Sequence, residues 1–70
     1  MEITIRDEYI KLGQALKLAG YVGSGVEAKM VITDGAVTVN GITEVRRGRK
    51  LRPGDVVGFN GETFGIKHAN

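Results

Sequence analysis

The sequence has no cysteine, no tryptophan, one histidine and one proline among its 70 residues. Without cysteine, neither a disulfide framework nor a thiolate metal site can form. The single histidine, His68, has no second histidine to accompany it. A typical zinc site and a Cys/His nucleophile pair are therefore excluded, and we expect no metal and no cofactor.

Long apolar runs are also missing. No stretch approaches the ~20 apolar residues that a membrane-spanning helix needs. The N-terminal sequence "MEITIRDEYI" lacks the pattern of a signal peptide. We therefore expect a cytoplasmic protein with no membrane partner. A chain of 70 residues is expected to form one domain, residues 1–70, with a core of aliphatic side chains.

The first half of the chain has the periodicity of two helices. Apolar residues recur at the spacing of one helix face at Leu12, Ala15, Leu16 and Ala19. Asp7 is expected to cap this helix and Gly20 to end it. Ser24 and Glu27 have the spacing of a capping box, which predicts a second helix that ends at Gly35. Each helix is predicted to have about three turns.

The second half of the chain has the period of strands. The segment "VTVNGITEV" is predicted to form a hairpin around Asn40-Gly41, since both residues tolerate positive φ. This turn places Val39 opposite Ile42 and Thr38 opposite Thr43. The turn explains Asn40 fully.

Three further strands are predicted. They cover residues 2–5 ("EITI"), 55–59 ("DVVGF") and 62–66 ("ETFGI"). Pro53-Gly54 marks a turn, and Asn60-Gly61 marks a second hairpin. The last four residues, 67–70, are expected to form a loose tail.

Positive charge is concentrated in one place. The chain has 10 basic and 8 acidic residues, a net charge of +2. The cluster "RRGRKLR" holds Arg46, Arg47, Arg49, Lys50 and Arg52. One interpretation is a solvated loop that keeps a small protein soluble. The other is a phosphate-binding surface, because Arg offers a bidentate fork and Lys a point charge.

Catalytic patterns are weak. A triad of Ser24, His68 and an aspartate can be drawn, but no feature of the sequence places these residues together. The segment "GYVGSG" lacks the lysine and the preceding strand of a phosphate loop. We therefore expect no enzyme and no small-molecule substrate.

The segment "KLGQALKLAGYVGSGVEAKMVITDGAVTVNG", followed by "LRPGDVV", resembles the RNA-binding domain named after small-subunit ribosomal protein four. The helical core of that family is called the αL RNA-binding motif, and the resemblance covers about residues 11–57. The phrases "SGVEAK" and "RRGRKLRPGD" are similar to the small stand-alone bacterial subgroup called YaaA or YbcJ. The resemblance implies an α+β fold in which two helices pack against a small, mostly antiparallel sheet of four to five short strands.

The resemblance also implies an RNA-binding surface. Lys11 and Lys29 stand at positions that are often basic in the family. Gly25 departs from the family, which commonly has Arg or Lys there. Lys29 lies four residues further on, on the same helix face, and can compensate. Gly13 replaces a frequent acidic residue, with no expected effect on RNA binding.

We therefore predict a non-catalytic protein that binds structured or double-stranded RNA, such as ribosomal RNA or transfer RNA. A ribosomal subunit is a further predicted partner. The predicted contacts are Lys11, Lys17, Ser24, Lys29, Arg46, Arg47, Arg49, Lys50 and Arg52. Aromatic residues are too few for a single-strand stacking platform, and Tyr9 and Tyr21 are expected to pack in or beside the core. The alternative is a protein-interaction module that docks its basic loop onto an acidic protein. The RNA hypothesis requires the arginine cluster to flank the side of the helices that carries Lys11 and Lys29.

Overall fold

Two helices pack with a five-stranded mixed sheet and a separate pair of strands. The structure is a computed structural model and describes residues 1–69. Its elements are β1 (Glu2–Ile5), β2 (Ile10–Lys11), α1 (Leu12–Leu18), α2 (Gly25–Thr33), β3 (Val37–Val39), β4 (Ile42–Thr43), β5 (Lys50–Leu51), β6 (Val56–Phe59) and β7 (Glu62–His68). The expected α+β class with a mostly antiparallel sheet is confirmed.

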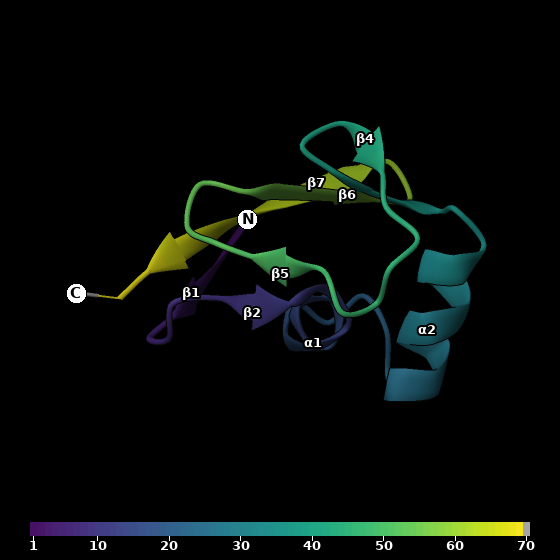
Figure 1. Cartoon of the computed structure of the whole chain (residues 1–70), viewed down its shortest axis with the longest axis horizontal. Coiled ribbons are helices and arrows are strands. Elements are labelled where there is room, and N and C mark those ends of the chain that lie inside the picture. Colours follow the sequence, from purple (N-terminus) through teal and green to yellow (C-terminus); the bar gives the residue numbers. More distant parts are fainter. Residues whose placement is uncertain (70) are drawn as a thin grey trace.

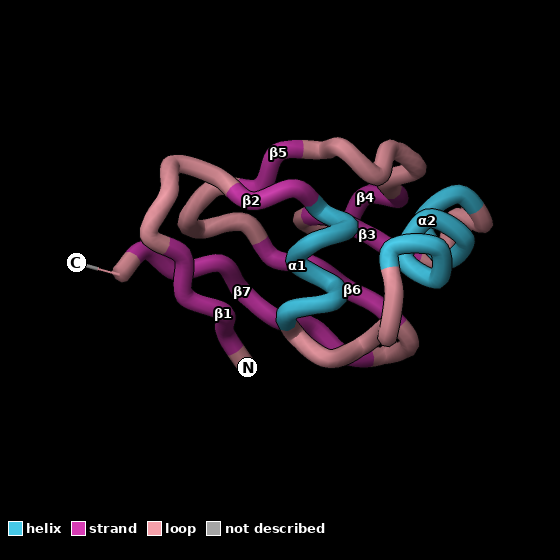
Figure 2. Tube along the Cα trace, turned by 90° about the horizontal axis from the view of Figure 1, so that it is seen from below, coloured by secondary structure: helices cyan, strands magenta, loops and turns pink. Residues whose placement is uncertain are grey.

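The large sheet has the strand order β1-β7-β6-β3-β4, and only the pairing of β1 with β7 is parallel. Strands β2 and β5 pair antiparallel as a second, two-stranded sheet, here called the ribbon. In Figure 1 the ribbon and α1 lie below β6 and β7. Figure 2 shows that β2 leads directly into α1 while β5 runs alongside β2.

The core lies between these layers. Its largest fully buried side chains are Phe64, Leu12, Leu16, Ile32, Leu51, Val37 and Val57. They come from both helices, from the large sheet and from the ribbon, so every layer contributes to one apolar cluster. Burial of this kind supplies most of the stability of a small domain without disulfides.

The helix signals are confirmed in their main features. Leu12, Ala15 and Leu16 of the predicted stripe are buried and Ala19 is partly buried, and Gly20 ends the helix with φ of 84°. Ser24 caps α2, since its Oγ accepts the Glu27 N–H at 3.1 Å. Glu27 Oε1 accepts the N–H of Gly23 at 2.8 Å, one residue earlier than the usual capping box. Both helices are shorter than predicted, with 7 and 9 residues.

The predicted cap at Asp7 is wrong. Helix α1 begins at Leu12, and Lys11 occupies the N-cap position with an extended backbone and no side-chain cap. The preceding residues pair instead with β5, Ile10 opposite Leu51 and Lys11 opposite Lys50. The extra strand therefore takes up the chain that a longer helix would have used.

The prediction of a loose tail is also wrong for residues 67–69, the part of the tail that the structure describes. Lys67 and His68 belong to β7, and His68 lies opposite Ile5 in the parallel pairing with β1. The Ala69 N–H donates to the carbonyl oxygen of Ile5 at 2.8 Å. Backbone hydrogen bonds to β1 extend β7 as far as His68. This pairing joins segments far apart in sequence, so the polar composition of the tail did not indicate it. Asn70 lies outside the described residues.

The first hairpin has the predicted register, with Val39 opposite Ile42 and Thr38 opposite Thr43. The turn alone does not explain Asn40, however. Its side-chain amide donates to Asp55 Oδ1 at 3.0 Å, and its Oδ1 accepts the Val56 N–H at 2.9 Å. Asn40 therefore ties the hairpin to the start of β6 as well as turning the chain.

Asp55 is held by the same group of contacts. Burial raises the pKa of its carboxyl, but the Arg52 N–H and the Asn40 amide outweigh that effect, so the pKa is lowered overall. The Arg52 N–H donates to Asp55 Oδ2 at 2.8 Å. The turn at Pro53-Gly54 is thus fixed to the hairpin through two side chains.

A matched pair of asparagines tests this role. Asn40 and Asn60 both have φ of 54°, which glycine adopts without strain. Asn40→Gly removes two side-chain hydrogen bonds and should lower the free energy of unfolding by about 1–2 kcal/mol more than Asn60→Gly. Urea denaturation of both variants measures the difference. Equal losses would show that the side-chain contacts of Asn40 contribute nothing.

Candidate nucleic-acid interface

The arginine-rich segment is docked against the start of α1. Residues 44–49, here called the arginine loop, connect β4 to β5. The Leu12 N–H donates to the carbonyl oxygen of Arg49 at 2.9 Å, and the Gly13 N–H donates to that of Arg47 at 3.2 Å. The first N–H groups of a helix have no partner within the helix. Loop carbonyls therefore supply the cap that Asp7 was expected to provide.

Gly13 allows the loop to approach this closely. A Cβ atom at Gly13 would stand 2.8 Å from Cγ of Arg47 and 3.8 Å from Cβ of Ala28. The aliphatic part of the Arg47 side chain therefore packs against α1 at Gly13, near the place where α1 contacts Ala28 of α2. A side chain at Gly13 would displace Arg47. The expectation that Gly13 has no effect on RNA binding stays a prediction.

Three cations gather where the loop meets α1. Lys11, Lys17 and Arg47 line a hollow of about 250 Å³, here called the loop hollow, with Gly13, Gln14 and Gly48. No acidic side chain is among the residues that line it. Lys11 and Lys17 come from the continuous segment of β2 and α1, and Arg47 comes from the loop about thirty residues later in the sequence. This juxtaposition is the one that the RNA hypothesis requires for Lys11 and the cluster.

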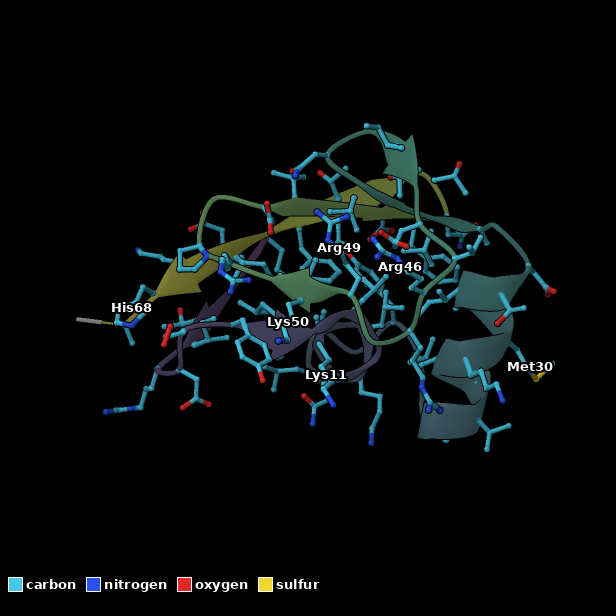
Figure 3. All side chains as sticks on the ribbon, viewed as in Figure 1. Lys11, Met30, Arg46, Arg49, Lys50 and His68 are labelled. Atoms are coloured by element: carbon cyan, nitrogen blue, oxygen red, sulfur yellow. The ribbon has the colours of Figure 1, made fainter. Side chains whose placement is uncertain are left out.

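The ribbon extends the positive charge away from the loop hollow. Lys11 and Lys50 lie opposite each other in the pairing of β2 with β5. Figure 3 shows these two lysines together, below the position of Arg46 and Arg49. Arg52 follows one residue after β5, with its guanidinium 5.7 Å from the centre of the Tyr9 ring. The cations of β2 and of the segment after the loop therefore form one continuous group.

Arg46 and Arg49 are bound to a buried carboxylate. Arg46 Nε donates to Glu44 Oε2 at 2.9 Å, and Arg49 Nη1 donates to Oε1 at 2.8 Å. Glu44 is only 7% exposed. The hydrogen bonds from Arg46, and then those from Arg49, lower the pKa of Glu44 to about 2. The five cations of the cluster are therefore not equivalent.

Glu44 is a functional residue that the sequence interpretation missed. It stands directly before the cluster, and its N–H donates to the Val37 carbonyl oxygen at 2.9 Å. The predicted hairpin register, extended by one pair beyond Thr38 and Thr43, puts Glu44 opposite the buried Val37. Extending the register in this way would have identified Glu44 from the sequence, because a carboxylate on the core side of a hairpin needs cationic partners.

Two predicted contacts lie elsewhere. The Ser24 hydroxyl is used by the cap of α2, and Ser24 does not line the loop hollow. Lys29 is exposed on α2, next to the buried Ala28. Among residues 1–69 it has no side-chain hydrogen bond or ion pair. Its predicted compensation for Gly25 stays a prediction.

Other site types were searched for in the described part of the chain. Within residues 1–69, no group of three His, Asp or Glu side chains is arranged to hold a metal ion. No helix in that part combines the length and the apolar character needed to cross a bilayer.

Comparison with known proteins identifies the family. The family model described as the S4 domain matches residues 3–67. The chain belongs to the S4-domain family. The match extends beyond the resembling segment 11–57 at both ends, and it includes all but the first residue of β1 and all but the last residue of β7.

Relatives of this S4-domain chain are small proteins of similar length. A Bacillus subtilis protein named as a probable ribosome maturation protein, RlbA, is 49% identical over 59 residues, which cover 84% of this chain and 83% of RlbA. YbcJ of Escherichia coli K12 is 38% identical over 58 residues, which cover 83% of each chain. The expected likeness to the stand-alone YbcJ subgroup is thereby confirmed.

Solved structures agree. The solution structure of Escherichia coli YbcJ, described as having an αL motif involved in RNA binding, matches with a TM-score of 0.73 and 31% identity over 94% of this chain and 85% of YbcJ. The ribosomal protein S4e of Thermoplasma acidophilum matches with a TM-score of 0.63 and 26% identity. That match covers 83% of this chain and 31% of S4e.

Glu44 gives the site a pH dependence that can be measured. Its pKa of about 2 in the folded state lies below the ordinary value of 4.5. The stabilisation is therefore complete above the ordinary pKa and is lost as the pH falls toward the folded pKa. Glu44→Gln should lower the free energy of unfolding at neutral pH by roughly 1–3 kcal/mol, because two guanidinium groups lose a charged acceptor.

The difference between wild type and Glu44→Gln should narrow as the pH is lowered to about 3. Urea denaturation at neutral and acidic pH measures it. Glu8→Gln, at an exposed carboxylate outside the loop, is the control and should show no comparable difference. A gap between wild type and Glu44→Gln that is constant with pH would contradict the role of the ionised carboxylate.

Proposed function

We propose that this S4-domain chain binds structured RNA, without catalysing a reaction on it, through the cationic face formed by Lys11, Lys17, Arg47, Lys50 and Arg52. The observation that carries the proposal is the docking of the arginine loop on α1. Its two backbone hydrogen bonds bring Arg47 to the same hollow as Lys11 and Lys17, which belong to a segment far from the loop in sequence. The YbcJ structure, described as having an RNA-binding motif, supports the same function.

The chemistry of this face suits a phosphate backbone. A polyanion presents closely spaced phosphates, and its affinity for a protein comes largely from cations that replace condensed counterions. Arg47 offers a planar fork to a phosphate, while the lysines act as point charges. Because the chain has only two tyrosines, two phenylalanines and no tryptophan, it lacks a platform for many stacked bases. This combination favours duplex or folded RNA, read mainly by shape and phosphates.

Ribosomal RNA is the class of RNA that we propose. The relative RlbA is named as a probable ribosome maturation protein and is 49% identical over 59 residues. The S4e protein with the same fold is a component of the 30S subunit. Binding to ribosomal RNA or to a ribosomal subunit would place the protein in the cytoplasm, where these particles are assembled.

Arg46 and Arg49 have a different role in this proposal. Their ion pairs with Glu44 hold the loop in the shape that presents Arg47. The side chain of Arg46 remains 71% exposed, so it can still lend charge to a bound phosphate. Ser24 and Lys29 stay as predicted contacts outside this face. Replacing Arg46 or Arg49 is therefore expected to act through folding as well as through charge.

Salt dependence tests the proposal. Four or five phosphate contacts imply that the affinity for an RNA stem-loop falls about a hundredfold between roughly 50 and 200 mM salt. The double variant Lys17→Ala, Arg47→Ala should bind every RNA sequence more weakly. It should also reduce the slope of log affinity against log salt by about two. Fluorescence anisotropy titrations measure both quantities.

Lys67→Ala is the matched control, because Lys67 is an exposed cation on β7 that does not line the loop hollow. It should leave the affinity and the slope nearly unchanged. A flat salt response of the wild-type protein would contradict RNA binding through phosphates. Nuclease treatment of a native pull-down addresses the acidic-protein alternative, since direct protein partners remain bound after the RNA is digested.

A further inference from the structure

Tyr9 is an aromatic residue that the core does not use. Tyr21 packs against Phe59 and Phe64, with ring centres 6.1 and 5.4 Å away. Tyr9 is absent from the core cluster and is 36% exposed. A half-exposed tyrosine ring presents apolar surface to water, which a folded protein normally limits. Its surroundings therefore call for an explanation.

The ribbon places Tyr9 among cations. The pairings of Ile10 with Leu51 and of Lys11 with Lys50 continue by one step to Tyr9 and Arg52. Leu51 is fully buried, so the alternate positions of the ribbon face outward. Lys50 Nζ stands 4.9 Å from the centre of the Tyr9 ring, and Cζ of Arg52 stands 5.7 Å from it. The outer face of the ribbon thus carries one aromatic ring and three cations.

A hollow of about 690 Å³ opens beside this ring and is here called the tyrosine hollow. Besides Tyr9, the hollow is lined by the apolar residues Ile5, Ile10 and Leu18, by Asp7 and Gln14, and by the cations Arg6 and Lys17. Its volume is within the range of about 300–1,000 Å³ that is typical of small-ligand sites. Unlike the loop hollow, its lining includes apolar side chains and a carboxylate, whereas Gln14 and Lys17 line both hollows.

The aromatic and apolar part of this lining suits a nucleobase. Arg6 and Lys17 in the same lining offset the charge of Asp7, so the phosphate attached to that base can also be accommodated. A base has apolar faces that stack on an aromatic ring, and its edge carries N–H donors that a carboxylate or an amide oxygen can accept. The cations on the ribbon are then placed for the phosphates on either side of that base.

We infer that Tyr9 stacks on one unpaired base of the bound RNA, seated in the tyrosine hollow, while Lys11, Lys50 and Arg52 hold the flanking phosphates. The inference rests on the proposed function and specifies which RNA structure the protein prefers. The preferred RNA has a duplex with a single unpaired nucleotide beside it. A base inside a duplex is already stacked on its neighbours and is not available to Tyr9.

Two RNA hairpins test the inference, one with a single bulged adenosine in its stem and one with the same stem fully paired. Wild type should bind the bulged hairpin more tightly. Tyr9→Ala should weaken binding to the bulged hairpin roughly 5- to 150-fold, the range for the loss of one base–aromatic stack, and should change binding to the paired hairpin little. Tyr9→Phe keeps the ring and should retain the wild-type preference.

Tyrosine fluorescence provides an independent measurement. The chain has two tyrosines and no tryptophan, so Tyr21→Phe leaves Tyr9 as its single tyrosine emitter. This substitution keeps the ring that packs against Phe59 and Phe64. The bulged hairpin should quench the emission of this variant more strongly than the paired hairpin does. Equal quenching by both would count against stacking.

The outcomes separate this inference from the proposed function. If wild type binds both hairpins equally with a steep salt dependence, RNA binding stands and the unpaired-base site is overturned. A loss for Tyr9→Ala that is equal on both hairpins also overturns it, since the ring would then act only by positioning Lys50 and Arg52. If wild type binds neither hairpin, both the proposed function and the inference fail.

Discussion

The arrangement of the cationic face depends on how the first N–H groups of α1 find acceptors. A helix of 7 residues is too short to be stable alone, and its unpaired N–H groups need partners when they are covered by protein. Leu12 and Gly13 obtain them from the main chain of the arginine loop. Because the acceptors are carbonyls, the side chains of that loop remain available for other contacts. Helix capping and charge placement are thus one structural feature, and disturbing the loop disturbs both.

Glu44 reduces the repulsion between the positive charges that the loop brings together. Five cations within seven residues repel one another, and the cost is greatest for those that lie over the core. The buried carboxylate of Glu44 compensates two of them, Arg46 and Arg49. The group still carries a net positive charge, so the pairing organises the loop without neutralising it. Within residues 1–69 the remaining cations of the cluster, Arg47, Lys50 and Arg52, form no ion pair, and Lys50 and Arg52 lie over the Tyr9 ring. Because Glu44 pairs with Arg46 and Arg49, these two arginines hold the loop in shape, while Arg47 and Arg52 present their charge at the surface.

Local signals predicted much of this fold, and long-range pairings account for what they missed. The apolar stripe of α1, the Ser24 cap and the Asn40-Gly41 register depend on neighbours within a few residues, and all three are present. The ribbon and the end of β7 depend on partners about forty or more residues away, which no local pattern specifies. The same holds for the site. The cluster was visible in the sequence, but its division by Glu44 and the approach of Arg47 to Gly13 exist only once the loop is docked.

The ribbon links the two hollows mechanically. Strand β2 runs directly into α1, and β5 directly follows the arginine loop, so the same short connected segments border both hollows (Figure 2). Lys11 belongs to both regions, because it lines the loop hollow and pairs with Lys50 on the ribbon. A rigid connection means that little freedom is lost when a ligand contacts both places at once. In the proposed complex, phosphates and an unpaired base would therefore have to arrive at a fixed spacing. On this surface, selectivity for RNA shape would arise from the spacing between contacts that are individually unspecific.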